Sequence, residues 1–293
     1  MERARTIRTM AICYDAMMAS ELSDLPISYS ERDTMLYALG LGIGSNPEEH
    51  RELAYVYERY GPHTVPSFAS MLIPNDLLAA TDCNIRQMLH RTQSIELYRP
   101  LPGAGDFLLN QKVVNVFDHG ADKGAEVELE SELRRRRDDV VVCTLLSRII
   151  LRADGGFGGP APAVRTRHKI PNRAADMTCD IQTRPDQALI FRLSGDLNPL
   201  HVDPDVASDA GFEMPILHGR CTFGIACRAV LGTVCDYDFT LIKSFDARFS
   251  APVYPGDLIA TEMWQDRNVV SFRCRIPARN AVVINNGRCT LTG

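Results

Sequence analysis

The sequence predicts an α+β protein built from two unequal copies of one unit, in which an antiparallel sheet wraps around a central helix. Runs that alternate apolar with polar residues, rich in β-branched side chains, occur in both halves and are typical of half-buried strands. Helical patterns are fewer, and one is apolar on nearly every side, which indicates a buried helix. The length of 293 residues corresponds to about two domains. We expect the central helix to be degenerate in the first copy.

Local periodicity predicts the individual elements. A helix is expected over residues 31–41 with Ser30 as its N-cap, and a shorter helical pattern covers residues 186–193. The buried helix is expected from Gly219 to about Val234. Alternation predicts strands over residues 113–117, 125–133, 140–151, 258–264, 269–276 and 282–292.

A linker separates the two copies. Residues 154–180 are rich in glycine, proline and arginine and show no apolar period, so we expect them to cross the surface. The chain then divides into an N-terminal repeat (1–153), the linker (154–180) and a C-terminal repeat (181–293). Three pairs of similar segments support the repeat: 33–40 with 186–193, 65–69 with 214–218, and 94–106 with 245–257.

Composition argues against several classes of protein. A net charge of −5 does not give the basic surface of a nucleic-acid-binding protein. Nine cysteines without a C-x-x-C pair predict neither a disulfide framework nor a thiolate zinc site, and they fit a reducing compartment. No apolar run reaches the ~18 residues of a membrane span. Residues 1–20 resemble a transit sequence only weakly, and the ending Leu-Thr-Gly is no peroxisomal signal. We expect a cytoplasmic protein, with a peroxisomal or mitochondrial location left open.

One polar segment stands among apolar neighbours, Leu-Ser-Gly-Asp-Leu-Asn-Pro-Leu-His-Val-Asp-Pro over residues 193–204. Its glycine and first proline favour a fixed turn that holds Asp196, Asn198 and His201 on one loop. A carboxylate and an imidazole on one loop can share a water molecule, so that one removes a proton and the other delivers one. These residues therefore predict acid–base chemistry on a bound water or an acidic C–H group.

Gly219, the first residue of the buried helix, supplies a second requirement of this chemistry. Proton transfer beside a carbonyl group needs stabilisation of the negative charge that develops on the carbonyl oxygen. A backbone N–H at a helix N-terminus provides it, and a glycine lets a ligand approach closely. His218 precedes this glycine, and we expect it to order the loop before the helix.

The segment over residues 193–224, Leu-Ser-Gly-Asp-Leu-Asn-Pro-Leu-His through His-Gly-Arg-Cys-Thr-Phe-Gly, closely resembles the signature of the R-specific, type-2 enoyl-CoA hydratases in the MaoC-like group. Residues 29–40, 90–102 and 155–159 are similar to the two-repeat members, so the resemblance covers most of the chain from about Pro26. It implies a double hot-dog fold. The C-terminal repeat would carry catalysis, while the N-terminal repeat, which has no Asp-x-Asn-Pro-x-His in residues 40–46, would accommodate the acyl chain.

The same resemblance implies a role for each motif residue. Asp196 and His201 would hold and activate a water molecule, Asn198 would position it, and the Gly219 N–H would polarise the thioester carbonyl. The implied reaction is reversible syn hydration of a trans-2-enoyl-CoA to the (3R)-3-hydroxyacyl-CoA, with no cofactor and no metal. Which member of the Asp196–His201 pair acts as the base stays open. We expect an acyl-CoA thioester as the substrate and a homodimer as the assembly.

The sequence departs from the family pattern in two places. It has His90-Arg-Thr-Gln93 where the two-repeat members usually have His-Gly-Glu-Gln, and Arg220 where a leucine usually follows the helix-starting glycine. We expect His90, Gln93 and Arg220 to bind substrate, and these departures leave the acyl preference open. The same chemistry on a bulky steroid side-chain, polyketide or branched acyl group is therefore one alternative. A non-catalytic acyl-CoA-binding hot-dog subunit is the other.

Other polar groups have simpler interpretations. Asp196, His201, Asp203 and His218 match no standard metal-ligand spacing, so no metal site is predicted. Asp203 and Asp205 are expected to cap a short helix ending near Ala210. The glycine run 155–159 lacks the strand and helix that flank a dinucleotide-binding loop. Cys221 and Cys227 are expected to pack as small hydrophobic residues. The arginine run 134–137 is expected to form a solvated hairpin tip, with contact to coenzyme A phosphates as the alternative.

Overall fold

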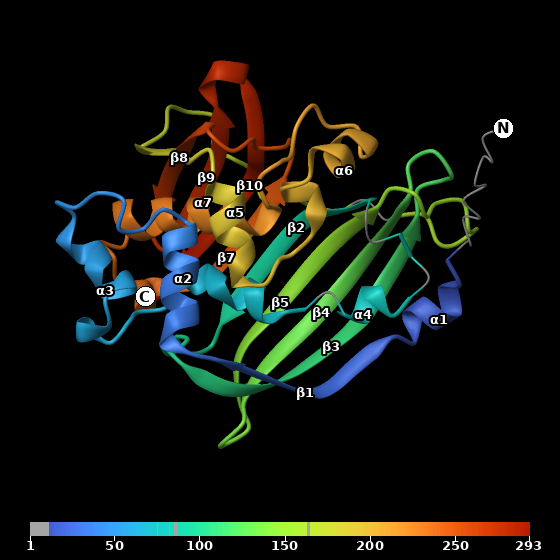
Figure 1. Cartoon of the computed structure of the whole chain (residues 1–293), viewed down its shortest axis with the longest axis horizontal. Coiled ribbons are helices and arrows are strands. Elements are labelled where there is room, and N and C mark those ends of the chain that lie inside the picture. The colour runs from blue at the N-terminus through green and yellow to red at the C-terminus, as the bar shows by residue number, and fades with distance from the viewer. Residues whose placement is uncertain (1–11, 75, 82, 85–86, 163–164) are drawn as a thin grey trace.

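The computed structural model describes residues 12–74, 76–81, 83–84, 87–162 and 165–293. Ten strands form one antiparallel sheet in the order β1-β3-β4-β5-β2-β7-β10-β9-β8-β6, with α7, α5 and α2 close together beside it (Figure 1). The strands are β1 (Glu21–Tyr29), β2 (Met88–Leu97), β3 (Gly105–Asp118), β4 (Ala125–Arg135), β5 (Val140–Leu151), β6 (Met177–Gln182), β7 (Ile242–Phe249), β8 (Leu258–Asp266), β9 (Val269–Ile276) and β10 (Ala281–Leu291). The α-helices are α1 (Tyr14–Met18), α2 (Glu31–Gly40), α3 (Leu53–Val56), α4 (Asp76–Ala79), α5 (Gln187–Phe191), α6 (Pro204–Asp209) and α7 (Gly219–Thr233).

The strand order shows that the two halves are copies of one unit. From one outer edge to the centre the order is β1, β3, β4, β5, β2, and from the other edge it is β6, β8, β9, β10, β7. In both halves of the chain, the first strand is thus at the edge and the second strand at the centre. The second strands, β2 and β7, pair at the centre through Thr92–Glu96 and Ser244–Arg248. Two of the predicted segment pairs therefore become neighbours: β2 and β7 share hydrogen bonds, and α2 packs against α5. The halves thus share one continuous sheet.

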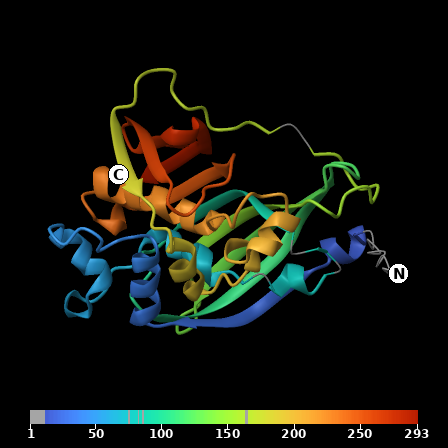
Figure 2. The same ribbon diagram turned by 45° about the horizontal axis from the view of Figure 1, so that its top comes forward.

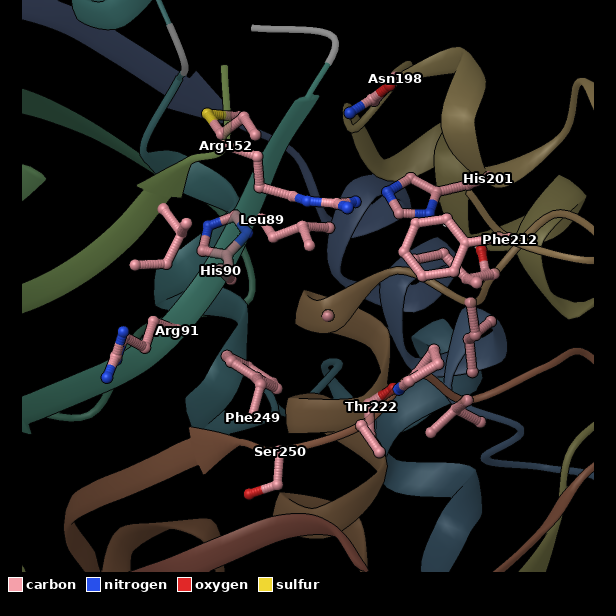
Figure 3. A pocket seen from close by; sticks show the side chains of 18 of the residues that line it. Leu89, His90, Arg91, Arg152, Asn198, His201, Phe212, Thr222, Phe249 and Ser250 are labelled. Carbon is pink, nitrogen blue, oxygen red and sulfur yellow. Dashed lines mark hydrogen bonds between the residues drawn. The ribbon is translucent and has the colours of Figure 1, made fainter. Parts of the chain in front are cut away.

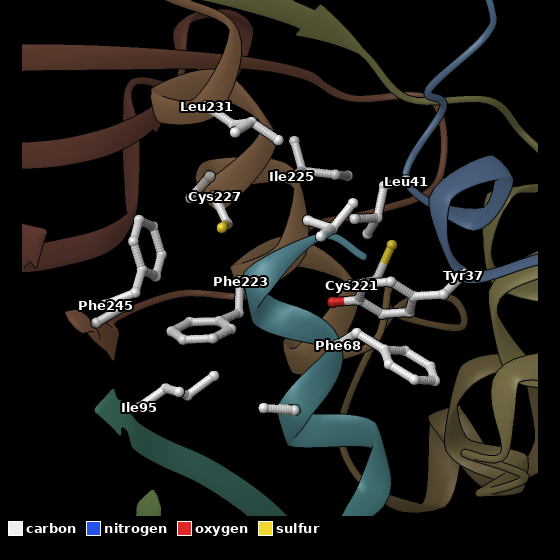
Figure 4. Close-up of a cluster of buried hydrophobic side chains, with 14 of the residues drawn as sticks. Tyr37, Leu41, Phe68, Ile95, Cys221, Phe223, Ile225, Cys227, Leu231 and Phe245 are labelled. Carbon is white, nitrogen blue, oxygen red and sulfur yellow. The ribbon is translucent and has the colours of Figure 1, made fainter. Parts of the chain in front are cut away.

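The two copies differ most in their central helix. Helix α7 has 15 residues and is buried along most of its length. The N-terminal copy has the short 3-10 helix η3 (Pro66–Leu72) packed against α7 instead, which agrees with the predicted degenerate helix. Figure 4 shows Phe68 of η3 and Tyr37 of α2 close to Cys221. Cys221 and Cys227 are fully buried in this core, as predicted.

The predicted elements correspond closely to the structure where the chain is apolar. The strands predicted over 140–151 and 269–276 match β5 and β9. Ser30 is confirmed as the N-cap of α2, and its backbone N–H donates a hydrogen bond of 2.8 Å to the Asp33 side chain in a capping box. Strands β1 and β6 were not predicted from the sequence. The linker predicted to reach residue 180 ends earlier, because β6 starts at Met177 and pairs with β8. Its half-buried residues alternate with exposed polar ones, a weak pattern typical of an edge strand.

The outer strand β1 is irregular. Its pairing with β3 shifts register between Leu22 and Leu25, Asp24 has a φ of +51°, and Pro26 lies within the strand. Asp24 also forms an ion pair with Arg134 at the end of β4. The arginine run 134–137 spans the β4–β5 turn, where Arg135 binds Asp138 at 2.7 Å, and it does not line the cavity described below. The predicted hairpin tip is thus confirmed.

Two further features concern the ends of the repeats. Residues 1–11 of the segment weighed as a transit sequence lie outside the described residues. After β5, the linker extends across the molecule to reach β6 on the far edge of the sheet (Figure 2). Among the described residues, no helix combines the length and the apolar character needed to cross a membrane.

Candidate active site

The polar loop between α5 and α6 has the fixed shape that its sequence predicts. Gly195 takes a φ of +118°, a left-handed conformation that favours glycine, and so turns the chain into Asp196. The Asn198 side-chain oxygen accepts a hydrogen bond of 3.0 Å from the backbone N–H of Leu200, which begins a single 3-10 turn ending at His201. Asn198 therefore keeps its amide NH₂ group to donate elsewhere.

The surroundings of His201 determine its protonation. The ring is buried, and its Nδ1 lies 2.9 Å from the backbone carbonyl oxygen of Ile216. A carbonyl only accepts, so Nδ1 carries the hydrogen and Nε2 keeps its lone pair. Burial lowers the pKa of His201, although Asp196 and the Ile216 carbonyl act in the opposite direction. His201 is therefore a neutral imidazole whose free nitrogen can accept a proton.

His218 connects the loop to the start of α7. It is completely buried, and its Nε2 donates a hydrogen bond of 3.0 Å to the backbone oxygen of Asp196. Its ring lies 3.9 Å from that of His201 between centroids. Burial lowers the pKa of His218 to about 3, so the two neighbouring rings are both uncharged at neutral pH. These contacts fit the ordering role predicted for His218.

Asp196 lies in the centre of these groups as a buried carboxylate. Burial acts to raise its pKa, but the charge of the Arg220 guanidinium acts against burial, and the pKa is lowered. Arg220 is itself buried on α7, and this burial lowers its pKa, although the charge of Asp196 acts in the opposite direction. The site thus holds an ionised carboxylate beside a neutral imidazole.

A cavity of about 470 Å³ opens between the two repeats at this point. Asp196, Asn198, His201 and Gly219 line it from the C-terminal repeat, and His90 lines it from β2. Figure 3 shows His90, Asn198 and His201 around this space. Because α7 begins at Gly219, the N–H groups of its first turn have no carbonyl partner within the helix. The helix N-terminus therefore meets the carboxylate and the imidazole in one cavity.

Five of the seven predicted site residues line this cavity, and two do not. Gln93 lies away from it and accepts a hydrogen bond of 2.9 Å from Ser147 Oγ. Arg220 is buried behind the cavity wall, where it acts on Asp196. Sequence reasoning missed Arg152, which enters the cavity from the end of β5 and donates a hydrogen bond of 2.9 Å to the Ala210 backbone oxygen. No motif surrounds Arg152, so only the fold reveals it.

The metal interpretation changes in one respect. Asp203, weighed as a fourth ligand, instead caps α6 by accepting a hydrogen bond of 2.9 Å from the Asp205 backbone N–H. Asp196, His201 and His218 each offer one ligand atom, and these atoms lie within 4.8 Å of one another. The same three residues can equally hold and activate a water molecule, which requires only the protonation states already described.

Comparisons with known proteins show to which family the chain belongs. The family profile of the MaoC like domain matches residues 167–285, and that of the MFE-2 hydratase 2 N-terminal domain matches residues 27–153. A relative from Arabidopsis thaliana named "Enoyl-CoA hydratase 2, peroxisomal" is 35% identical over 288 residues, which is 92% of this chain and 93% of the relative. A Mycobacterium tuberculosis relative named "3-hydroxyacyl-thioester dehydratase Y" is 38% identical over 243 residues, covering 81% of this chain and 82% of the relative.

A solved structure gives the same result. The crystal structure of a MaoC-like dehydratase from Phytophthora capsici is 31% identical and has a TM-score of 0.82, covering 96% of this chain and 98% of that one. The fold and site define a double hot-dog protein whose second repeat is MaoC-like, as the sequence predicted. The chain belongs to the MaoC-like hydratase 2 family.

Proposed function

We propose that this chain is a hydro-lyase that catalyses the reversible syn hydration of trans-2-enoyl-CoA to (3R)-3-hydroxyacyl-CoA. The observation that carries the proposal is the meeting of Asp196, His201 and the N-terminus of α7 at Gly219 in one cavity. The names of the Arabidopsis and M. tuberculosis relatives support the same chemistry, because each names the reaction in one of its two directions.

The proposed reaction uses the protonation states found in the site. Asp196 and His201 hold one water molecule, and one of them takes a proton as the water oxygen bonds to C3 of the acyl chain. The pair returns a proton to C2 on the same face, so that one water molecule is added in total. The Asn198 amide NH₂ positions the water. The Gly219 N–H donates to the thioester oxygen, where negative charge develops while the C2–C3 double bond is lost.

Two substitutions test these roles. Asp196→Asn and His201→Gln keep the size of each side chain but remove its ability to accept a proton at the working atom. We expect each to lower kcat for hydration of crotonyl-CoA by about 10²–10⁴-fold, while thermal unfolding and circular dichroism stay close to wild type. Activity near the wild-type level in either folded variant would show that the pair is not catalytic.

The acyl preference and the alternatives need a separate experiment. A panel of trans-2-enoyl-CoA thioesters that vary in length and bulk, with chiral analysis of the products, distinguishes straight-chain from steroid side-chain, polyketide or branched substrates. We expect the 3R product throughout. A 3S product would contradict the proposal, and binding of every thioester without turnover would identify a non-catalytic acyl-CoA-binding subunit.

The assembly and the compartment are also proposals. We propose a homodimer, which light scattering coupled to size-exclusion chromatography tests by giving twice the 32.6 kDa of the chain. For the compartment, the nine free cysteines support a reducing environment such as the cytoplasm. The name of the Arabidopsis relative supports a peroxisome instead. Fluorescence localisation of the full-length tagged chain separates the two.

A further inference from the structure

Asp196, His201 and His218 form a compact group of side chains with the chemistry of metal ligands. Each offers one ligand atom, and these atoms lie within 4.8 Å of one another. All three residues are buried, and His218 is completely so. Among the residues that the structure describes, no other group of three histidine, cysteine or acidic side chains meets this condition. A metal ion that prefers such ligands would therefore find them here.

The hydrogen bonds of the two histidines leave one nitrogen of each neutral ring with a free lone pair. His201 Nδ1 donates to the Ile216 carbonyl oxygen at 2.9 Å, so Nε2 carries no hydrogen. His218 Nε2 donates to the Asp196 backbone oxygen at 3.0 Å, so Nδ1 carries none. This Nδ1 is buried and has no hydrogen-bond partner among the described residues. Histidines that bind metals usually donate their second nitrogen to an oxygen in the same way.

The backbone holds the three side chains close to the spacing that a metal requires. Asp196 and His201 lie on the polar loop, and His218 is the N-cap residue of α7. The ring centroids of the two histidines are 3.9 Å apart, and Figure 3 shows His201 directed into the cavity. Ligand atoms around a tetrahedral zinc lie about 3.4 Å apart at bond lengths of 2.0–2.1 Å. Small rotations of the side chains would therefore complete the site.

The ligand set selects the ion. Two imidazole nitrogens and a carboxylate oxygen suit Zn²⁺, whereas Mg²⁺ and Ca²⁺ prefer oxygen ligands. We propose that Asp196, His201 and His218 bind a Zn²⁺ ion that inhibits the enzyme. The ion would occupy the carboxylate of Asp196 and the lone pair of His201, which the proposed reaction needs for its proton transfers. The positive charge of Arg220 acts on Asp196 and opposes a second cation, so binding should be reversible. The inhibition rests on the proposed function, whereas the metal site does not.

Isothermal titration with ZnCl₂ tests the metal site without any need for turnover. We expect His218→Gln to raise the Kd at least about tenfold, since loss of even an outer hydrogen-bond partner costs 10–100-fold in metal affinity. Glutamine keeps a donor for the Asp196 backbone oxygen but removes the lone pair of Nδ1. The matched control is His50→Gln, which makes the same change at an exposed histidine in the 3-10 helix His50–Glu52. It should leave the Kd within about twofold of wild type.

Two precautions keep the titration decisive. All proteins carry Cys13→Ser, because the exposed thiol of Cys13 could bind zinc independently. His218 is completely buried, so Asp196→Asn is the second variant if His218→Gln does not fold. It removes the charged ligand at nearly constant size and should also raise the Kd at least about tenfold. Wild-type affinity in a folded variant at either position, or an equal loss in His50→Gln, would overturn the assignment.

Hydration of crotonyl-CoA then tests the inhibition. We expect Zn²⁺ to inhibit the wild type at concentrations close to its Kd, and EDTA to restore the activity. Mg²⁺ at the same concentrations should not inhibit, because the site offers it too few oxygen ligands. Activation by Zn²⁺, or binding without inhibition, would overturn the inhibitory role. If the wild type binds Zn²⁺ at this site but hydrates no enoyl thioester, the proposed function fails while the metal site stands.

Discussion

We expect the substitution Gly219→Ala to lower the rate of hydration while it raises the stability of the fold. A Cβ at residue 219 would lie 3.6 Å from His90 Cβ and 3.8 Å from the Phe249 ring, which are ordinary van der Waals contacts. Alanine is also the better helix former, so we expect the folded chain to gain about 0.4–1 kcal/mol of unfolding free energy. The added methyl group nevertheless projects into the cavity beside the Gly219 N–H. It would keep the thioester oxygen from reaching that donor.

The rate should therefore fall although the fold improves. Removal of one oxyanion donor costs about 2.7–4 kcal/mol of transition-state stabilisation, or 10²–10³ in kcat. The assay is hydration of crotonyl-CoA, followed by the loss of ultraviolet absorbance of the enoyl thioester, beside thermal unfolding of the same sample.

Gly224→Ala on the same helix provides the matched control. Its Cβ would lie 2.5 Å from Leu41 Cδ2 and 2.7 Å from the Tyr37 hydroxyl, so we expect a loss of about 1–3 kcal/mol from overpacking. The folded fraction of this variant should keep its kcat. Wild-type turnover by Gly219→Ala, or a loss of stability as large as that of Gly224→Ala, would refute the role given to the Gly219 N–H.

Four further predictions follow from the site and the sheet. The lowered pKa of His201 places the acid limb of kcat/KM below pH 6.5, because activity falls only when the neutral ring gains a proton, and an acid limb centred above 6.5 would contradict this tautomer. His90 and His218 have pKa values lowered to about 3 in the folded chain. The stability that they contribute is therefore complete above their unfolded pKa of about 6.5 and is lost as the pH falls towards 3. Urea unfolding at several pH values measures how the free energy of unfolding changes with pH. Dialysis against EDTA should leave hydration unchanged, whereas loss of activity with recovery on adding Zn²⁺ would restore the metal interpretation of Asp196, His201 and His218. A chain that starts at Asp180 should be insoluble or inactive, because it exposes the β7 edge and removes His90 from the cavity, and soluble active protein would show that the repeats fold separately.

Local signals in the sequence were sufficient for the loop and helix that carry the chemistry. Gly195 and Asn198 fix their turn by backbone conformation and a hydrogen bond two residues away, and α7 is apolar on nearly all sides. Such features depend on neighbours in the chain, so they can be predicted without knowledge of the fold.

Residues that depend on distant contacts could not be placed in this way. Arg220 follows Gly219 in sequence, but the rotation of about 100° between successive helical residues turns it away from the cavity and towards the core. Gln93 shares a strand with His90 yet binds Ser147 on the neighbouring strand β5. Arg152 comes from the other repeat, and only the packing of the repeats brings it to the site.

The irregular strand β1 limits how the sheet can be extended at that edge. Strands β2 and β7 would each be an edge strand if the two repeats were separate chains. Because they pair with each other within one chain, these two edges are already hydrogen-bonded. Within the part of the chain that the structure describes, the two edge strands of the sheet are β1 and β6. On β1, Pro26 offers no backbone N–H and the bulge at Asp24 twists the strand, which are the features that protect edge strands from adding further strands. Addition of a second copy to the sheet at β1 is thereby disfavoured, so contact between two copies at that edge would use side-chain surfaces and not backbone hydrogen bonds.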